Sequence, residues 1–484
     1  MMKIKIILFN QHWFHLCAAA EAVLYNKDHI ESVELIFIRK GLLVWPLDAH
    51  FPSQFQSFSR FSPEYKLYKF LRDQLSDTNI EVMFTEPKIS PTDNILDKDH
   101  KFNEFSQLRK FRYLSQPVGM AISSYLISKT RSSTPLLKKY QRLISDLYAT
   151  YFQIQSYLNS VVSESNTDEV WLCNGRQLHE RSVVEFCKSQ QIRIKFFEIG
   201  GDGNALSRWI LHDHSPHDRV KFQQEIETHW LNRRDNEFEE LDKWFEEKLD
   251  PKLNPFTTNQ VKNLDLGLTE KYLVFYTSSD DEVAAISEDW DSPWGNQVEA
   301  AKMLIDFFKK EEEIKLVIRV HPNILNKSKS DQLNWKNLVP NENVVIIPPE
   351  SRIDSYALLM HSEGVFTYGS TMGVEAVYRG LPLALLSRAR YDIILENEFI
   401  DDKEKLSSWV SKAKSRSLLK PSRLGSLMWA NYFLTAGHPW KITRVTSRGK
   451  RKVGYLGERK MRPNSVFILS SRLLNSFHSH SNLL

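Results

Sequence analysis

Three polar segments in the C-terminal half of the chain have residue types that bind phosphorylated ligands. Each one comes at the end of a short apolar run, which predicts a buried strand. Hydroxyl groups, an imidazole and exposed backbone N–H groups are suitable partners for phosphate oxygens. The segments are Thr277-Ser278-Ser279, Arg319-Val320-His321-Pro322-Asn323 and Tyr368-Gly369-Ser370-Thr371.

The pair His321-Pro322 follows the apolar run 316–320. Proline cannot continue a central strand, so the chain turns here and His321 is expected at the ligand-binding edge of a sheet. An ordinary strand-to-loop turn is the alternative. The pair His438-Pro439 follows no predicted strand, and we assign it to packing or to a turn.

The turn Gly369-Ser370-Thr371 precedes a predicted helix over 371–379. Ser370 or Thr371 can cap that helix, and free N–H groups at a helix start favour an anion such as phosphate. Glu375, one turn further on, is expected to accept hydrogen bonds from sugar or ribose hydroxyls. A plain helix cap is the alternative.

The N-terminal half offers a candidate general base. Asn174-Gly175-Arg176 ends one predicted strand, and Glu198 ends the next, on the glycine-rich segment 198–204. A carboxylate on such a loop can take a proton from an acceptor. Glu198 is therefore the first candidate and Asp202 the second, with His12 or His15 to be considered if both fail. A polar surface turn is the alternative.

No metal site is predicted. The acids Asp280-Asp281-Glu282 are typical of the first turn of a helix. The cluster His212-Asp213-His214 with His217 has neither cysteine partners nor a helical HExxH frame. Walker A, GxSxG and GxGxxG motifs are also absent from the sequence, which argues against P-loop NTPases and NAD oxidoreductases. No cofactor is expected.

The pattern of apolar residues predicts the strands and helices that could position these polar segments. Strands alternate with helices over 271–387, which predicts a parallel sheet covered on both faces, a Rossmann-like α/β domain. Segments 3–38 and 169–198 repeat the pattern, so we expect two Rossmann-like domains facing a cleft. The predicted boundaries are 1–255 with a helical insertion at about 62–163, a linker at 250–269, a second domain at 270–430 and a tail at 431–484.

Composition and charge set limits on the class of protein. The 484 residues are 42% apolar and 26% charged, enough for two to three domains. Residues 441–484 carry ten Lys or Arg and one acid, a charge of +9 within a chain of +4, which suggests an anionic surface partner. Three cysteines without a CxxC pair indicate a reducing compartment, and no apolar run is long enough to span a membrane. We expect a cytoplasmic protein that is peripheral at the inner face of the membrane.

Taken together with Asp354-Ser355-Tyr356-Ala357-Leu358-Leu359, these motifs resemble bacterial surface and capsular polysaccharide glycosyltransferases of the GT-B fold, related to the capsule Kdo transferases. The resemblance covers about 170–200 and 271–390. It implies a CMP-activated nucleotide-sugar donor bound by the C-terminal domain, and a surface glycan or lipid-linked acceptor bound by the N-terminal domain. The resemblance implies that His321-Pro322 contacts the nucleotide and that Ser370-Thr371 binds its phosphate. The motifs themselves add Ser278, Ser279, Arg319, Tyr368, Gly369 and Glu375 to the predicted donor site.

The expected reaction needs no metal, because the helix start and Arg319 would stabilise the departing phosphate. Ser370-Thr371 stands where the family has Ser-Ser, and Ile199 where it has Arg. A CDP-polyol phosphotransferase of the teichoic-acid type is the alternative enzyme. A non-catalytic scaffold that binds a membrane or polyanion through 441–484 is the alternative from another class, and a nucleic-acid partner is not expected.

Overall fold

The structure of the chain is a computed structural model, and it divides into two compact units. The N-terminal unit comprises Met1–Tyr125, Leu136–Pro216 and Phe433–Leu484, and the C-terminal unit comprises Leu126–Pro135 and His217–Tyr432. The residues that the structure describes are 1–9, 12–47, 62–91, 101–162, 167–200, 207–233, 238–250, 252, 254, 257, 259–279, 283–448, 451–457 and 459–461.

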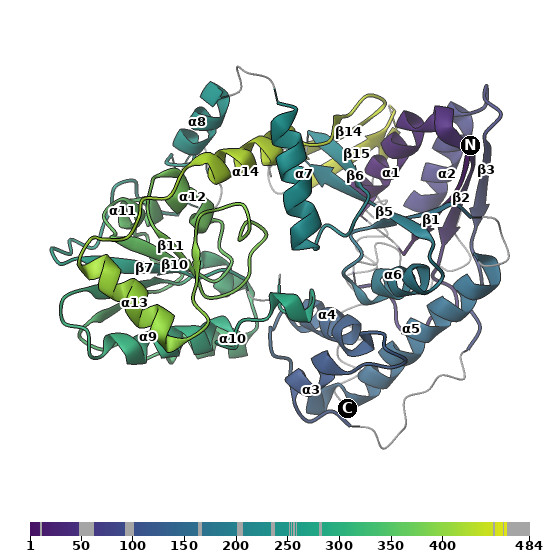
Figure 1. Cartoon of the computed structure of the whole chain (residues 1–484). Coiled ribbons are helices and arrows are strands. Elements are labelled where there is room, and N and C mark those ends of the chain that lie inside the picture. The colour runs from purple at the N-terminus through teal and green to yellow at the C-terminus, as the bar shows by residue number, and fades with distance from the viewer. Residues whose placement is uncertain are drawn as a thin grey trace. The chain divides into compact units, whose positions relative to one another are not determined.

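The N-terminal unit is built on one sheet with the strand order β13-β6-β5-β4-β1-β2-β3. Strands β1, β2, β3, β5 and β6 of this sheet are labelled in Figure 1. The five strands that pair in parallel are β1 (Met2–Leu8), β2 (Ile30–Phe37), β3 (Glu81–Thr85), β4 (Glu169–Cys173) and β5 (Arg193–Gly200). Two strands that the sequence pattern did not predict, β6 (Arg208–His212) and β13 (His438–Pro439), extend the sheet in antiparallel pairing. The second of them gives His438-Pro439 a place at the sheet edge.

Helices accompany this sheet along the chain. They are α1 (Trp13–Tyr25), α2 (Pro63–Gln74), α3 (Phe105–Lys110), α4 (Val118–Thr130), α5 (Gln141–Val161) and α6 (Leu178–Ser189). The predicted insertion over about 62–163 is thus largely helical, but it also contains β3. That strand lies at the sheet edge and alternates between exposed and half-buried residues, so it lacks the continuous apolar run of a central strand.

The C-terminal unit is built on a second sheet, in which each neighbouring pair of strands is parallel. Its strand order is β12-β11-β10-β7-β8-β9. The strands are β7 (Tyr272–Tyr276), β8 (Lys315–Arg319), β9 (Val344–Ile347), β10 (Gly364–Thr367), β11 (Leu383–Leu385) and β12 (Glu398–Phe399). The helices of the unit include α9 (Gln297–Phe308), α10 (Lys329–Lys336), α11 (Ser355–Met360), α12 (Met372–Tyr378), α13 (Lys403–Lys414) and α14 (Leu424–Thr435). The prediction of an α/β protein with two Rossmann-like units is confirmed.

Helices α7 (Arg219–Leu231) and α8 (Phe238–Glu247) belong to the C-terminal unit, so the units divide near 216 instead of near the predicted linker. The ring of Phe245 stacks on that of Tyr378 with 3.7 Å between centroids. Arg219 Nη1 lies 2.6 Å from a carboxylate oxygen of the buried Asp392. These contacts attach α8 to α12 and α7 to the segment between β11 and β12, within the C-terminal unit.

The chain returns to the N-terminal unit after α14, where β14 (Thr443–Arg448), β15 (Arg451–Leu456) and β16 (Arg459–Met461) form antiparallel pairs beside α1 (Figure 1). Leu456 lies in the same apolar cluster as the buried face of α1. Glu21, a buried residue of α1, accepts the backbone N–H groups of Lys441, Ile442 and Thr443 at 3.1, 2.7 and 2.5 Å. Part of the predicted tail is therefore an ordered component of the fold.

Replacing Glu21 by alanine is expected to lower the free energy of unfolding by about 3 kcal/mol, because three backbone donors lose a charged acceptor. The segment around Lys441 should then become sensitive to trypsin. Urea denaturation and limited proteolysis measure the two effects, and Glu31→Ala, at an exposed position on β2, is the matched control. Wild-type stability and protease resistance in Glu21→Ala would contradict this role.

Both sheets contain a topological switch point, where the direction of strand addition reverses. It lies between β1 and β4 in the N-terminal unit and between β7 and β10 in the C-terminal unit. Open α/β sheets bind ligands outside the carboxyl ends of the strands at such points. The polar segments identified from the sequence follow these four strands and their neighbours β5 and β8.

Candidate functional site

At the switch point of the C-terminal sheet, a hydrogen bond from Ser278 connects the segments that follow two neighbouring strands. Its Oγ donates to the carbonyl of Tyr368 at 2.8 Å, which ties the segment after β7 to the segment after β10. Its backbone N–H donates to Oε1 of Gln297, a buried residue at the start of α9, at 2.6 Å. The structure therefore brings two of the three predicted segments together.

The turn after β10 depends on glycine. Gly369 has a φ of +80°, in the left-handed region that side chains disfavour. Gly373 leaves room for Tyr391, since a Cβ at that position would lie 2.7 Å from its Oη. The Tyr391 hydroxyl donates to the carbonyl of Ser370 and lies 3.1 Å from Oγ1 of Thr367. Tyr391, which the sequence did not single out, thus holds the Ser370 turn in place.

Ser370 and Thr371 lie at the start of α12, as predicted. Ser370 is buried and its Oγ accepts the N–H of Met372 at 3.4 Å, whereas Thr371 is exposed and its side chain makes no capping hydrogen bond. Tyr368, also buried, donates from its hydroxyl to the carbonyl of Gly295. Phosphate binding by Ser370 and Thr371 stays a prediction.

His321 follows the neighbouring strand β8, and its hydrogen bonds define which of its ring nitrogens carries the proton. Its backbone N–H donates to Oγ1 of Thr277 at 2.8 Å, and its Nδ1 accepts the N–H of Asn323 at 3.1 Å. Nδ1 therefore carries no proton, and Nε2 is the N–H donor. Burial, assisted by the nearby cations Arg319 and Lys327, lowers the pKa of His321 to about 4, so the imidazole is neutral at physiological pH.

Ser279 and Pro322 complete this edge. The side-chain amide of Asn323 donates to Oγ of Ser279 at 2.9 Å, which links the segments after β7 and β8. Pro322 begins a short 3-10 helix, Pro322–Asn326, for which His321 is the cap. Ser278, Ser279, His321 and the 369–371 turn thus follow three adjacent strands, β8, β7 and β10.

Arg319 has a different position from the one predicted. The residue is buried, and its guanidinium donates to the carbonyl of Pro348 at 2.7 Å and to that of Ser351 at 3.2 Å. It therefore anchors the segment after β9 instead of facing a phosphate. The physical reason is that Arg319 ends a central strand buried on both faces, so its charged group has to be satisfied by carbonyls inside the unit.

Glu375 also points into the unit. It is buried, and its Oε1 lies 2.5 Å from Nζ of Lys248, whose ammonium lies 3.3 Å from the centroid of the Trp244 ring. Its Oε2 is buried without a hydrogen-bond partner in the described part of the chain. Burial raises the pKa of Glu375 and Lys248 lowers it, with burial the larger effect. A contact with a sugar or ribose hydroxyl stays a prediction.

The switch point of the N-terminal sheet brings together Glu198, Asn174 and His15. The Nδ2 of Asn174 donates to Oε1 of Glu198 at 2.8 Å, and Nε2 of His15 lies 3.8 Å from the other carboxylate oxygen. Glu198 is on β5, Asn174 follows β4 and His15 is in the first turn of α1. The second candidate base, Asp202, lies outside the described residues.

The turn that presents Asn174 is strained. Asn174 and Gly175 both have positive φ, at 54° and 81°. A Cβ on Gly175 would lie 2.5 Å from Cε1 of Phe196, so only glycine fits here. Backbone strain of this kind is often found at functional sites. His12 lies nearby, with its ring 6.2 Å from that of His15.

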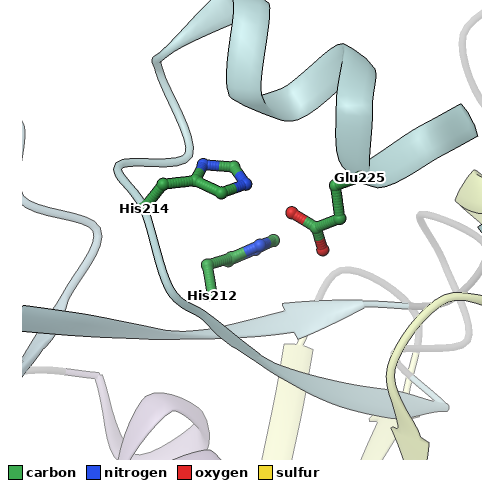
Figure 2. Close-up of side chains that lie close together, drawn as sticks. All are labelled: His212, His214 and Glu225. Carbon is green, nitrogen blue, oxygen red and sulfur yellow. The ribbon is translucent and has the colours of Figure 1, made fainter. Parts of the chain in front are cut away.

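The histidines 212 and 214 come from the end of β6 and the turn after it, with 5.7 Å between ring centroids (Figure 2). Glu225, also drawn there, is on α7 of the other unit, and we assign it no role together with the histidines. His217 accepts a hydrogen bond from Trp290 through its carbonyl, within the C-terminal unit. The acids Asp280, Asp281 and Glu282 lie outside the described residues.

The geometry thus defines an α/β protein with polar residues at the switch points of two Rossmann-like sheets. Residues 222–433 match the family model described as "Capsule polysaccharide biosynthesis protein". This match confirms the predicted resemblance to capsule polysaccharide biosynthesis proteins for that segment, which forms most of the C-terminal unit. No curated protein matches the sequence of this chain.

Similar solved structures share only low sequence identity with the chain. KpsC, a beta Kdo 2,4 transferase from Thermosulfurimonas dismutans, is 12% identical with a TM-score of 0.36, covering 55% of this chain and 79% of its own. UDP-GlcNAc 2-epimerase from Methanocaldococcus jannaschii is 13% identical with a TM-score of 0.27, covering 88% and 97%. The same enzyme from Neisseria meningitidis is 12% identical with a TM-score of 0.29, covering 89% and 97%. Likenesses with such TM-scores do not assign an activity.

Proposed function

We propose that the chain is a glycosyltransferase that moves a sugar from a nucleotide-sugar donor to a surface glycan or lipid-linked acceptor, and that the donor is CMP-activated. The family match over 222–433 supports a role in capsule polysaccharide synthesis. The observation that carries the proposal is the neutral, fixed imidazole of His321 beside the hydroxyl groups at the C-terminal switch point.

The hydrogen-bonding state of His321 makes the end of strand β8 suitable for binding a nucleotide. The Nδ1 atom is occupied by the N–H of Asn323, so the ring presents Nε2–H as a donor, which can bind a carbonyl or phosphate oxygen of the ligand. Ser279 and the Ser370–Thr371 turn flank it on the adjacent strand ends. Because these groups belong to the segments that Ser278, Gln297 and Tyr391 hold in place, the donor would meet a preorganised edge.

Donor turnover tests the proposal. The purified chain is expected to release CMP from a CMP-activated sugar and to transfer the sugar to a glycan or lipid-linked acceptor. Release of glycerol phosphate or ribitol phosphate from a CDP-polyol would instead establish the teichoic-acid type of enzyme. If the chain turns over neither class of donor but still binds anionic surfaces, the alternative of a non-catalytic scaffold would be supported.

Metal independence is part of the proposal, and chelation tests it. We expect the transfer rate to remain within about twofold in EDTA, since hydroxyl, imidazole and backbone donors would stabilise the departing phosphate. Activity that disappears in EDTA and returns with magnesium or manganese would contradict this expectation and direct attention to Asp280, Asp281 and Glu282.

We also propose that the basic C-terminal segment contacts an anionic membrane surface. The strands β14–β16 carry the basic residues Arg444, Arg448, Arg451, Lys452, Arg459 and Lys460. Thr443 and Leu456, which pair with each other across β14 and β15, are buried. No helix in the described part of the chain is long and apolar enough to cross a bilayer.

Removal of these charges gives a test with a matched control. Replacing Arg448 and Arg451 by glutamine is expected to weaken binding to phosphatidylglycerol vesicles about 10- to 30-fold, at roughly 1 kcal/mol for each basic residue near a charged surface. Replacing Lys302 and Lys309, exposed residues of the C-terminal unit, removes the same charge and should have a smaller effect. Co-sedimentation measures both variants, with phosphatidylcholine vesicles as the neutral reference. Equal losses in the two variants would contradict a specific contact through the C-terminal segment.

A further inference from the structure

The helical insertion of the N-terminal unit carries a concentration of positive charge that lies outside the candidate site. Segments 101–125 and 136–142, both within this unit, contain seven basic residues and one acid, Glu104, a net charge of +6. Residues 1–440 as a whole have a net charge of −5, so the positive charge is local to these segments. The basic residues, together called the basic surface, are Lys101, Arg109, Lys110, Arg112, Lys138, Lys139 and Arg142. All of them except Arg109 are exposed.

Direct contacts hold the two segments side by side. The side-chain amide of Gln141 donates to the carbonyl of Phe102 at 2.8 Å, and its Oε1 accepts the N–H of Phe102 at 3.4 Å. The rings of Phe102 and Phe111 lie edge to face, with 5.2 Å between centroids. Gly119 of α4 leaves room for α3, because a Cβ at that position would lie 1.8 Å from the carbonyl oxygen of Leu108. The basic residues are therefore presented by a closely packed part of the fold.

A tight turn between α3 and α4 exposes apolar side chains among these charges. Tyr113 and Gln116 exchange backbone hydrogen bonds of 3.1 and 2.9 Å, and Leu114 and Ser115 between them have positive φ values of 48° and 66°. Positive φ at both central residues is typical of tight hairpin turns. Tyr113 is 36% exposed and Leu114 is 77% exposed. A ligand that fits this surface therefore combines negative charge with apolar faces.

We propose that the basic surface binds an acidic polysaccharide, the acceptor chain of the transfer reaction. The carboxylates of such a chain would pair with the lysine and arginine head groups, and the C–H faces of its sugar rings would pack on the ring of Tyr113. This inference rests on the proposed glycosyltransferase function. It names the chemical class of the acceptor and the part of the N-terminal unit that holds it.

The position of the basic surface favours a polysaccharide over a membrane as the partner. Helix α3 lies at the end of the N-terminal unit that is remote from β14 and β15, for which we propose the membrane contact (Figure 1). A planar bilayer that touches β14 and β15 would therefore not reach α3. A polymer chain is not limited in this way, because it can extend along the unit from the site of transfer to the basic surface.

Binding of polygalacturonate, a polysaccharide with a carboxylate on each sugar, tests the proposal. Replacing Lys110, Lys138 and Lys139 together by glutamine is expected to weaken its binding to the full chain about 5- to 100-fold at low ionic strength, because three exposed charge pairs are lost. The matched control replaces three exposed lysines of the C-terminal unit, Lys302, Lys309 and Lys310, and should retain wild-type affinity within about twofold. Isothermal titration calorimetry measures both variants, with dextran as the neutral polysaccharide.

Several outcomes would overturn the assignment. A wild-type chain that does not bind polygalacturonate, or equal losses in the two variants, would show that the basic surface does not hold an acidic polysaccharide. Retained polygalacturonate binding in the first variant, combined with lost binding to phosphatidylglycerol vesicles, would assign the surface to a membrane. These measurements need no donor. A wild type that releases no CMP from a CMP-activated sugar would contradict the proposed function, whereas a chain that releases CMP but binds no acidic polysaccharide would contradict this inference alone.

Discussion

Replacing Glu198 by glutamine is expected to lower turnover about 10²- to 10⁴-fold while leaving nucleotide affinity unchanged. The substitution keeps the size of the side chain but removes the carboxylate that is the first candidate for the general base. The loss of a general base costs about 10²- to 10⁴-fold in rate. Steady-state kinetics and nucleotide titration measure the two quantities separately.

Glu81→Gln serves as the control, because Glu81 is an exposed residue at the edge strand β3 of the same sheet. It should retain wild-type turnover and affinity. Retained turnover in Glu198→Gln, combined with a large loss in Asp202→Asn, would move the essential carboxylate to Asp202. Retained turnover in both would exclude a carboxylate at this switch point from the reaction.

Replacing His321 by alanine is expected to weaken nucleotide binding about 5- to 150-fold, which corresponds to about 1–3 kcal/mol for a lost hydrogen-bond partner. The N–H of Asn323 would also lose its acceptor. Isothermal titration calorimetry measures the affinity, and His361→Ala, at an exposed histidine after α11, is the control. Wild-type affinity in a folded His321→Ala would contradict the site.

The protonation state of His321 predicts how nucleotide affinity depends on pH. Its pKa is lowered to about 4, below the ordinary value of 6.5, so the ring stays neutral until the pH falls well below 6.5. As far as His321 is concerned, nucleotide affinity should be constant between about pH 8 and 5.5, because the ring stays neutral over this range. A change in affinity centred near 6.5 that disappears in His321→Ala would show that the ring titrates normally.

The core of both sheets could be predicted because its strands are continuous apolar runs. Strands β7, β8 and β10 are buried along their whole length or nearly so, and helices follow them at regular spacing. Strand β6 was missed because Trp209 is its one fully buried apolar residue and its neighbours are mixed. The ordered part of the tail was missed because β14–β16 are rich in basic residues and depend on Glu21, more than 400 residues away in the sequence.

For the candidate site, the sequence indicated which segments meet but not how their side chains point. The ends of parallel strands share one edge of a sheet, so the motifs could be placed together. The orientation of Arg319 depends on carbonyls of the segment after β9, and that of Glu375 depends on Lys248 at the end of α8. Tyr391 and Gln297, which hold the polar segments in place, belong to no recognisable motif. Only the turn glycines Gly369 and Gly373 indicated that another residue packs closely against the turn.

The proposed function requires that the C-terminal switch point binds the nucleotide of an activated sugar. The most direct measurement is a thermal-shift series of the full chain with CMP, CDP, UDP and GDP, repeated on His321→Ala. A ligand at 100 times its Kd stabilises the native state by about 2.7 kcal/mol, which is readily seen as a rise in Tm. We expect CMP to give the largest rise in Tm and His321→Ala to abolish most of that rise. No rise with any of the four nucleotides, or an equal rise in the variant, would contradict it.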